Sequence, residues 1–422
     1  MSDVIIEKKN EVYLKLDCEP HILYELQPYF TFEVESAKFM SQYRSRHWDG
    51  KIRLLSTHTG EIYAGLLPKV IDKLENHNYK YQFKENKFYG QPFEINEEIS
   101  YEGVKGYMNS ICSHSPREYQ VEGVYDALRH NRKLLISPTA SGKSLMIYSL
   151  VRYYVDKGQK ILLVVPTTSL VEQMYKDFLD YGWDADSYCH RIYSGREKTN
   201  EYPVTITTWQ SVYKLERSFF EDYNVIIGDE AHLFKSKSLI EIMTKLHHAK
   251  YRFGFTGTLD GTQTHKWVLE GLFGPSYKVT RTDELMKQGH LSQLDIRCLV
   301  LKHQPQKFET YEDEIQYLIS HEQRNKFITN LSLDLKGNTL VLFSRVESHG
   351  AILYEKINSN KRDDRKVFFI HGGVDTEQRE LVREITERES NAIIVASYGT
   401  FSTGINIKNL HNVIFASPSK SR

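Results

Sequence analysis

The sequence predicts an α/β protein in which two parallel-sheet domains follow a small α+β domain. From Lys133 onward, short apolar runs alternate with longer helix-like stretches, as in βαβ units. The first hundred residues show a different pattern of short alternating strands. A chain of 422 residues with 40% hydrophobic content is also too long for one core.

Residues 1–90 are expected to form the α+β domain. The pattern predicts strands at residues 12–16, 52–55 and 62–66, and helices at residues 21–27 and 68–77. Residues 91–112 are predicted to be a linker, because an acidic stretch there is followed by Gly103 and Gly106.

Residues 113–283 are expected to form the first parallel-sheet domain. Its apolar runs are residues 134–136, 161–165, 204–206, 225–227 and 253–255. Each run ends in small or polar residues. Ligands of open α/β sheets bind beyond the carboxyl ends of the strands, so these endings should converge on one site.

Residues 284–422 are expected to form the second parallel-sheet domain. Its apolar runs and the helix-like segments between them are residues 339–343, 348–357, 367–370, 376–388, 393–395 and 413–415.

Composition excludes several classes of protein. The 55 basic and 55 acidic residues balance, so any surface that binds nucleic acid must be local. The four cysteines lie far apart without a CxxC pair, which disfavours a zinc site or a disulfide framework. The polar start and the lack of an apolar run of about 20 residues exclude a signal peptide or a membrane span. We therefore expect a soluble cytoplasmic protein with no membrane partner.

A candidate phosphate-binding loop follows the first run of the first parallel-sheet domain and opens a helix. It reads Ser137-Pro138-Thr139-Ala140-Ser141-Gly142-Lys143-Ser144. In such a loop, backbone N–H groups face the phosphates, the lysine gives a positive charge and the last hydroxyl can bind magnesium. Ser137 stands where the general motif has glycine, so an ordinary strand-to-helix turn remains an alternative.

Two adjacent carboxylates supply the partner that this loop needs. Asp229 and Glu230 follow the apolar strand at residues 225–227, and the end of a buried strand seldom carries two carboxylates without an ion. Asp229 can hold Mg²⁺ through its water shell, and Glu230 can orient and deprotonate an attacking water. The predicted catalytic residues are therefore Lys143, Asp229 and Glu230, with Ser144 and Asp229 at the metal.

These motifs, with Thr256-Gly257-Thr258 beyond them, resemble those of the superfamily-two helicases and translocases of the DEAH type. The resemblance runs from about residue 117 to the end. It implies two RecA-like motor domains, ATP and Mg²⁺ as cofactors, and nucleic-acid-stimulated ATP hydrolysis. It also implies that His232, Thr256 and Thr258 couple hydrolysis to movement.

The same resemblance assigns further residues. Arg117 and Gln120 match the motif that reads adenine, and Gly404 is expected to touch nucleotide. The residues expected to contact nucleic acid along the motor are Thr167, Thr208, Gln210, Ser344, Arg345 and Thr400. The family's motif six should follow Ser417-Pro418, so we expect the sequence to stop within its second motor domain and to hydrolyse ATP poorly.

A stretch from Phe39 to Arg53 mixes basic and aromatic residues with few acids. Such a stretch can neutralise phosphates and stack bases. Its predicted DNA-binding residues are Arg44, Arg46, Trp48, Lys51 and Arg53. The alternative is a turn in which Trp48 belongs to a small core and the arginines are solvated.

This stretch before a DEAH motor resembles the phage recombination helicases. The resemblance implies a monomeric 3′–5′ helicase that acts on forks, Holliday junctions and RNA–DNA hybrids of R-loops in recombination, repair and replication. It also implies strand annealing. A phage protein of this kind would work in the host cytoplasm. Three alternatives stay open: a duplex DNA translocase that separates no strands, a P-loop small-molecule kinase, and an annealing protein whose ATPase is vestigial.

Overall fold

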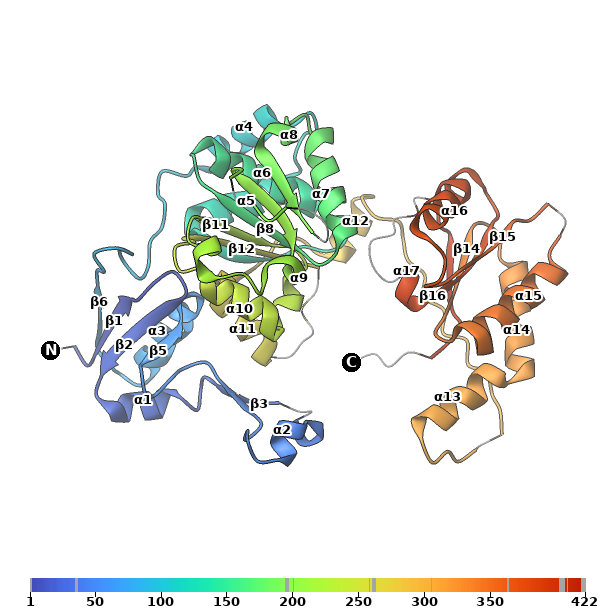
Figure 1. The fold of residues 1–422 in the computed structure, drawn as a ribbon, viewed down its shortest axis with the longest axis horizontal. Helices are drawn as coiled ribbons and strands as arrows, with labels where there is room; N and C mark the ends of the chain where they lie inside the picture. Colours follow the sequence, from blue (N-terminus) through green and yellow to red (C-terminus); the bar gives the residue numbers. More distant parts are fainter. Residues whose placement is uncertain are drawn as a thin grey trace. The chain divides into compact units, whose positions relative to one another are not determined.

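The chain divides into two compact units, residues 1–294 and 295–422 (Figure 1). The structure is a computed structural model that describes residues 2–34, 37–193, 197–199, 201–257, 259, 263–304, 306–362, 364–401, 407 and 409–418. Among these residues, no helix has the length and apolar character needed to cross a membrane.

The first unit begins with a small α+β module, residues 2–84, which we call the N-terminal module. Its described strands form a four-stranded sheet of order β5-β2-β1-β6, beside a two-stranded ribbon of β3 and β4. The sheet buries Val4, Ile6, Leu14 and Leu16 against apolar residues of α1 and α3. The elements are β1 (Val4–Lys8), β2 (Tyr13–Cys18), α1 (Pro20–Leu26), β3 (Thr31–Glu33), η1 (Ala37–Phe39), α2 (Ser41–Arg44), β4 (Lys51–Arg53), β5 (Glu61–Tyr63), η2 (Ala64–Leu66), α3 (Leu67–Asn76) and β6 (Tyr81–Lys84).

A helix lies within the segment that the sequence marks as a linker. Residues Tyr101–Ile111 form α4, whose Val104 and Met108 are buried. These two side chains belong to the same core as α5 (Glu118–His130) and α6 (Lys143–Asp156). The second half of the segment therefore packs as part of the first α/β domain.

The first α/β domain has a parallel sheet, as the alternating pattern predicts. Its described strands are ordered β13-β7-β12-β11-β8-β10-β9, and every pair is parallel. The remaining elements are β7 (Arg132–Ile136), β8 (Ile161–Val165), α7 (Thr168–Asp180), α8 (Ala185–Tyr188), β9 (Cys189–Ile192), β10 (Val204–Thr208), α9 (Trp209–Val212), η3 (Arg217–Phe220), β11 (Val225–Gly228), η4 (Ala231–Lys235), α10 (Lys237–Lys245), β12 (Tyr251–Thr256), α11 (Gln263–Phe273), β13 (Ser276–Lys278) and α12 (Thr282–Lys287).

Helices cover both faces of this sheet, so its strands are apolar on both sides. Along β8, Ile161, Leu163 and Val165 join the core with α4 to α7, whereas Leu162 and Val164 join the opposite core. That opposite core also contains the apolar residues of the N-terminal module. In Figure 1, α10 and α11 lie on the side of the sheet that faces the module.

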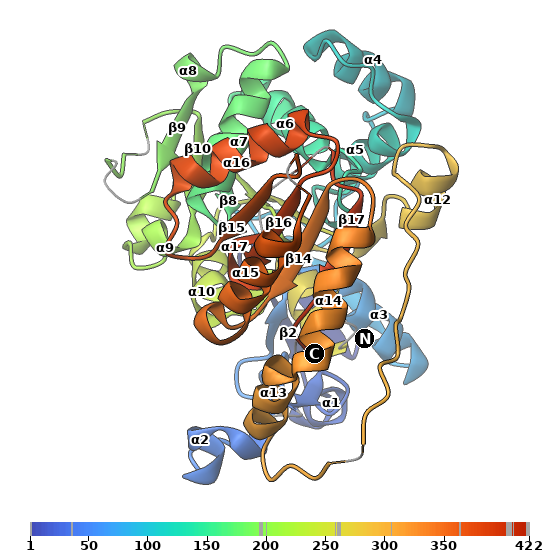
Figure 2. The ribbon, with the colours of Figure 1, turned by 90° about the vertical axis from the view of Figure 1, so that its right-hand side faces the viewer.

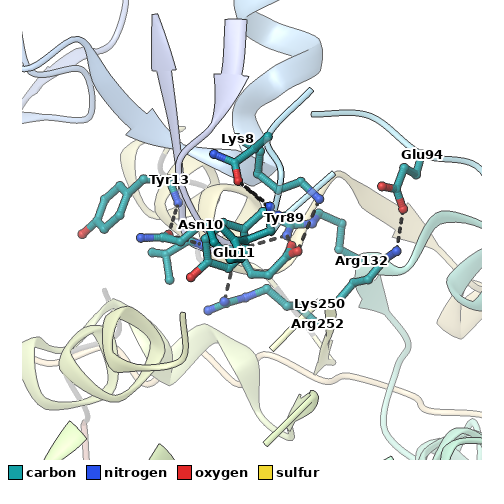
Figure 3. A network of polar contacts seen from close by, with 12 residues as sticks. Lys8, Asn10, Glu11, Tyr13, Tyr89, Glu94, Arg132, Lys250 and Arg252 are labelled. Atoms are coloured by element: carbon teal, nitrogen blue, oxygen red, sulfur yellow. Dashed lines mark hydrogen bonds and ion pairs between the residues drawn. The ribbon is translucent and has the colours of Figure 1, made fainter. Parts of the chain in front are cut away.

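A buried polar network joins the N-terminal module to the first α/β domain (Figure 3). Glu11 is 4% exposed, and its carboxylate lies 3.0 Å from the Arg132 guanidinium and 3.3 Å from the Lys8 ammonium. Its backbone carbonyl accepts from Arg252 at 3.2 Å. Arg252 is fully buried, and burial lowers its pKa to about 9. The guanidinium of Arg252 donates to backbone carbonyls of Met243, Leu246 and Leu272 as well.

Helix α11 supplies the apolar part of this junction. The indole of Trp267 packs against Tyr29, Phe30 and Phe32 of the module, with ring centroids 5.1 to 5.8 Å apart. A Cβ added to Gly65 of the module would lie 2.0 Å from the carbonyl oxygen of Glu270, so only glycine permits this approach. The N-terminal module is therefore a fixed part of the first unit.

The second unit contains the second parallel sheet. Its described strands are ordered β15-β16-β14-β17, and all pairs are parallel. Figure 2 shows α14 and α15 beside these strands. The elements are α13 (Tyr311–Ser320), α14 (Glu322–Asp334), β14 (Thr339–Phe343), η5 (Val346–Gly350), α15 (Ala351–Asn360), β15 (Val367–Ile370), α16 (Thr376–Arg388), β16 (Ile393–Ser397), α17 (Tyr398–Phe401) and β17 (Asn412–Phe415).

A buried histidine ties three elements of the second unit together. The ring of His349 hydrogen-bonds to the Ser417 hydroxyl at 2.8 Å and to the Asn325 side-chain oxygen at 3.1 Å. The Ser417 hydroxyl in turn accepts from the backbone N–H of Ser344. Burial and then the Arg324 charge lower the pKa of His349 to about 4, so the ring is neutral at pH 7.

We predict that Glu11→Ala lowers the stability of the first unit by about 3–5 kcal/mol, because it removes the carboxylate that pairs with the buried Arg132 and lies near the buried Arg252. Urea unfolding followed by tryptophan fluorescence measures this loss. Glu33→Ala is the matched control, because its ion pair with Lys51 is exposed and is worth less than about 1 kcal/mol. Equal losses in the two variants would contradict the prediction.

We also predict that His349 makes the second unit less stable as the pH falls. Above pH 6.5 the ring is neutral in both states. Between pH 6.5 and about 4 the unfolded chain takes up a proton that the folded ring does not, so the free energy of unfolding decreases. Hydrogen-exchange protection of β14 and α14, measured at pH 7.5 and 5.0, should fall more in the wild type than in His349→Gln. An equal fall in both proteins would show that His349 is not the cause.

Candidate functional site

The candidate phosphate-binding loop connects β7 to α6, as predicted. Gly142 stands at the N-cap of α6 with φ 78°, and Ala140 also has a positive φ of 62°. A Cβ added to Gly142 would lie 2.2 Å from Nε2 of Gln120. The loop therefore needs glycine at residue 142, both for the backbone angle and for space.

Ser137 closes the base of the loop. Its hydroxyl lies 2.6 Å from the Ser141 hydroxyl, and both side chains are fully buried. The Ser141 hydroxyl also reaches the Pro138 carbonyl, and the Ser137 N–H donates to the Thr256 carbonyl at 2.8 Å. A serine at this position thus adds a side-chain bond across the loop while its backbone stays in register with β12.

The N-terminus of α5 holds the loop from the other side. Gln120 is buried, its Nε2 donates to the Ser141 carbonyl at 2.9 Å, and its Oε1 accepts from the Arg117 N–H at 2.8 Å. The Tyr119 hydroxyl donates to the same Ser141 carbonyl at 3.0 Å. The Arg117 guanidinium donates to that hydroxyl at 2.8 Å. The predicted adenine-reading residues are therefore also the residues that fix the loop.

Lys143 and Glu230 meet across the site. The Lys143 ammonium lies 3.1 Å from a Glu230 carboxylate oxygen, although 87 residues separate them in the sequence. Glu230 has a left-handed backbone, φ 49° and ψ 51°, which begins the turn η4. Two predicted catalytic residues, one from the loop after β7 and one from the turn after β11, thus form one ion pair.

The carboxyl group of Asp229 is buried next to this ion pair. It is 7% exposed, and burial raises the pKa of its carboxyl to about 6, with Lys143 opposing the shift and Glu230 adding to it. One carboxylate oxygen accepts from the Glu230 N–H at 2.9 Å. Asp229 is therefore largely charged at pH 7 and has oxygen ligands to offer a hard cation.

The donors present suit magnesium. Among the described residues, no cluster of three or more His, Cys, Asp or Glu side chains could hold a metal ion. Magnesium needs no such cluster, because it keeps several waters and binds through one or two protein oxygens together with phosphates. The Ser144 hydroxyl lies near the Asp177 carboxyl, whose pKa burial raises and the nearby hydroxyl lowers.

Two of the residues predicted to couple hydrolysis to movement, His232 and Thr256, contact each other. His232 Nδ1 lies 3.1 Å from the Thr256 hydroxyl and 3.3 Å from the Glu230 carboxylate. Thr256 is fully buried at the end of β12, next to the loop strand β7. Thr258 lies outside the described residues.

The next strand ends carry the residues predicted to contact nucleic acid. Thr167 is the N-cap of α7 after β8, and Thr208 is the N-cap of α9 after β10. The Thr208 hydroxyl lies 2.9 Å from that of Ser211, and Gln210 is exposed. Both strands end at the same edge of the sheet as β11, which carries Asp229.

Some side chains of the basic stretch in the N-terminal module already have partners within the module. Arg53 pairs with Asp49 and Lys51 pairs with Glu33, while the Trp48 ring N–H donates to the Lys51 carbonyl at 2.8 Å. The half-buried Trp48 fits the alternative reading of a turn. Arg44 and Arg46 are exposed, and the described residues place no carboxylate against either.

In the second unit, Ser344 and Arg345 follow β14 and are exposed. Arg345 forms an exposed ion pair with Glu312 at 2.5 Å. Thr400 is buried in α17, with its hydroxyl 2.5 Å from that of Ser397. Gly404 lies outside the described residues.

Sequence reasoning missed two side chains of the site. Tyr119 stands beside Gln120 in the matched motif, so the motif itself was the signal. Asp177 lies on α7, 33 positions from Ser144, and only the packing of α7 against α6 brings the two together. No local pattern marks such a residue.

Comparison with known proteins identifies both parts of the first unit. Residues 3–84 match the family described as DNA helicase UvsW, N-terminal, and residues 113–261 match the family described as type III restriction enzyme, res subunit. The ATP-dependent DNA helicase uvsW of Enterobacteria phage T4 is 32% identical over 100% of this chain and 85% of its own length.

Solved structures agree. The crystal structure of T4 UvsW aligns with 100% of this chain and 85% of its own, with a TM-score of 0.59 and 30% identity. S. cerevisiae Dbp5 bound to RNA and ADP BeF3 matches 76% of this chain and 82% of its own, with a TM-score of 0.52 at 14% identity, which shows the fold alone. The prediction of RecA-like domains preceded by a small α+β domain is confirmed. The chain belongs to the UvsW family of ATP-dependent DNA helicases of superfamily two.

Proposed function

We propose that this helicase binds Mg²⁺-ATP at the Lys143, Asp229 and Glu230 site and remodels branched DNA. The observation that carries the ATP site is the meeting of the loop lysine with Glu230, next to the buried Asp229, where both carboxylates follow β11. The branched substrate is proposed from the relationship over the whole chain to T4 UvsW.

The ion pair suggests how hydrolysis begins. When phosphates enter the loop they compete with Glu230 for Lys143, since a lysine ammonium is a compact charge that phosphates attract strongly. Glu230 is then free to orient the attacking water and accept its proton. Its left-handed backbone keeps its side chain close to the lysine that holds the phosphates.

Asp229 and Ser144 would hold the metal. Bound Mg²⁺ neutralises the charge that develops on the transferred phosphoryl group. The buried Asp229 carboxylate would bind it through water, and the Ser144 hydroxyl would turn from Asp177 toward it.

Arg117 and Gln120 are proposed to contact adenine, with Pro138, Thr139, Ala140, Ser141 and Gly142 around the phosphates. An amide side chain offers two donor hydrogens and two acceptor lone pairs. Gln120 uses one of each to fix the loop, so one donor and one acceptor remain for the base. Gly404 is proposed as a further nucleotide contact.

The DNA track is proposed along the strand ends beyond Asp229, with Thr167, Thr208 and Gln210 on the first unit. Ser344, Arg345 and Thr400 would continue it on the second unit. His232, Thr256 and Thr258 would couple hydrolysis to movement, and the hydrogen bond between His232 and Thr256 is the described contact that supports this role.

The substrates we propose are forks, Holliday junctions and R-loops, with strand annealing as an associated activity of a monomer. The N-terminal module would contact DNA through the stretch that contains Arg44, Arg46, Trp48, Lys51 and Arg53. The 3′–5′ direction is supported by a relative named as a DNA 3′-5′ translocase, XPB2 of Sulfurisphaera tokodaii, which is 28% identical over 40% of this chain. The alternative is a duplex translocase that separates no strands.

The test measures ATP-dependent unwinding of a labelled fork by the wild type, Lys143→Ala and Lys157→Ala. We expect Lys143→Ala to lower ATP hydrolysis by about 10²- to 10³-fold and to abolish unwinding, because the loop loses its phosphate-binding charge. Lys157 lies exposed at the other end of α6 and should be neutral. Hydrolysis stimulated by duplex DNA without strand separation in the wild type would support the translocase instead.

We further predict that Thr256→Val uncouples hydrolysis from unwinding. Valine keeps the shape of the buried side chain but loses the hydrogen bond to His232. DNA-stimulated ATP hydrolysis should stay within about twofold of wild type while unwinding per ATP falls by about fivefold, since a neutral hydrogen bond is worth about 1 kcal/mol. Thr244→Val, which removes a hydroxyl from α10, is the control. A parallel loss of both activities would rule out a coupling role.

A further inference from the structure

We infer that the junction between the N-terminal module and the first α/β domain contains a binding site for a small oxyanion of the phosphate type. The site is a cavity bordered by the buried polar network that Figure 3 shows. It goes beyond the proposed function, because neither the ATP site nor the DNA track takes part in it. The lysine, arginine and glutamate residues that line the cavity are Lys8, Glu11, Glu94, Arg132, Lys133 and Lys250.

Two of the cations at this cavity share one carboxylate. Glu11 Oε1 lies 3.3 Å from the Lys8 ammonium, and Glu11 Oε2 lies 3.0 Å from the Arg132 guanidinium. Among the described residues, no second carboxylate pairs with either cation. Arg252, which donates to the Glu11 carbonyl, adds another buried positive charge. Buried charge is unfavourable unless it is paired, so this side of the cavity favours an anion.

The other ion pairs at the cavity do not supply the charge that is needed. The Lys133 ammonium lies 2.9 Å from the Asp126 carboxylate, and the Lys250 ammonium lies 2.6 Å from the Glu94 carboxylate. Each of these carboxylates already has a cation of its own. The charge balance at the cavity is therefore positive, although two glutamates line it.

Hydrogen-bond donors at the cavity also lack protein partners. Nη1 of Arg132 is buried, and no atom of the described residues accepts a hydrogen bond from it. The Lys8 ammonium has three donor hydrogens, and within the described chain Glu11 is its one acceptor. The Lys8 side chain is only 7% exposed. Buried donors are nearly always satisfied, and water would satisfy these donors without balancing the charge.

The size of the cavity and the type of its donors select the ligand. The volume is about 70 Å³, which is room for a few waters or one small polyatomic anion, but far less than a nucleotide or a DNA strand requires. A guanidinium group binds two oxygens of phosphate or carboxylate at once, and an ammonium group adds a compact charge. Leu67, Pro68 and Phe93 form apolar walls, which strengthen such interactions. Inorganic phosphate meets these requirements.

An anion at this place would hold three segments of the chain together. Lys8 belongs to the N-terminal module, Glu94 to the segment before α4, and Arg132 to β7 of the first α/β domain. A ligand that binds only the folded junction stabilises it increasingly as its concentration exceeds its dissociation constant. Free phosphate would therefore strengthen the attachment of the module to the motor domain.

The test measures the melting temperature of the full chain in potassium phosphate and in potassium chloride of equal ionic strength and pH, without nucleotide. Tryptophan fluorescence reports on the first unit, because all four tryptophans lie within residues 1–294. Lys8→Met removes the charge at the cavity and keeps the aliphatic chain. Lys84→Met is the matched control, because Lys84 is an exposed lysine of the same module and pairs with Glu7. Lys143→Ala removes the charge that would bind phosphate at the ATP site.

We expect phosphate at about ten times its dissociation constant to raise the melting temperature by about 2–4 °C in the wild type, Lys84→Met and Lys143→Ala. In Lys8→Met the rise should be smaller than about 1 °C. The general stabilisation that phosphate gives to folded proteins acts on all four proteins alike, so it cancels in the comparison. An equal rise in Lys8→Met and Lys84→Met would overturn the proposal.

Hydrogen exchange of the wild type gives a second measurement that does not depend on how well a variant folds. Phosphate should slow exchange at residues 8–13 and 130–133, in addition to any protection of residues 139–146 at the ATP site. Protection confined to residues 139–146 would show that phosphate binds at the ATP site alone. A rise in melting temperature that is lost in Lys143→Ala and kept in Lys8→Met would show the same, and either result would overturn the proposal while leaving the proposed function intact.

Discussion

The buried guanidinium of Arg252 is the interaction on which the first unit depends. Within the described residues no carboxylate contacts it, and its donors bind backbone carbonyls from the N-terminal module, from the end of α10 and from α11. A buried cation is tolerated only when its donors are satisfied. These three segments must therefore stay together, and Glu11 supplies the nearby negative charge that balances Arg252 and Arg132.

Strand β12, which contains Arg252, links this junction to the ATP site. β12 carries Arg252 as its second residue and ends at Thr256, whose carbonyl accepts from the backbone N–H of Ser137, the first residue of the phosphate-binding loop. The catalytic edge is thus built from adjacent strand ends: β7 gives the loop, β12 gives Thr256 and β11 gives Asp229. Because parallel strands share one direction, residues distant in sequence meet there without any long loop.

This geometry explains what the sequence could and could not predict. Apolar runs such as residues 161–165 and 339–343 coincide with β8 and β14, because buried parallel strands are apolar throughout. The fold class alone predicts that the loop with Lys143 and the strand end with Glu230 lie at one edge of the sheet, where the structure shows their ion pair. The contact of Ser144 with Asp177 could not be predicted in this way, because it depends on how two helices pack. The orientation of Trp48 could not be predicted either. A basic and aromatic stretch has the same sequence pattern whether its rings point toward solvent or into a core.

Helix α11 explains why the N-terminal module cannot be regarded as a separate appendage. Phe273 at its end packs against Phe234 of η4, the turn that starts at Glu230 and carries His232. Trp267, near its start, packs against the module. Helix α11 therefore packs against both the turn that carries His232 and the module, so one helix links the ribbon of the module to the ATP site.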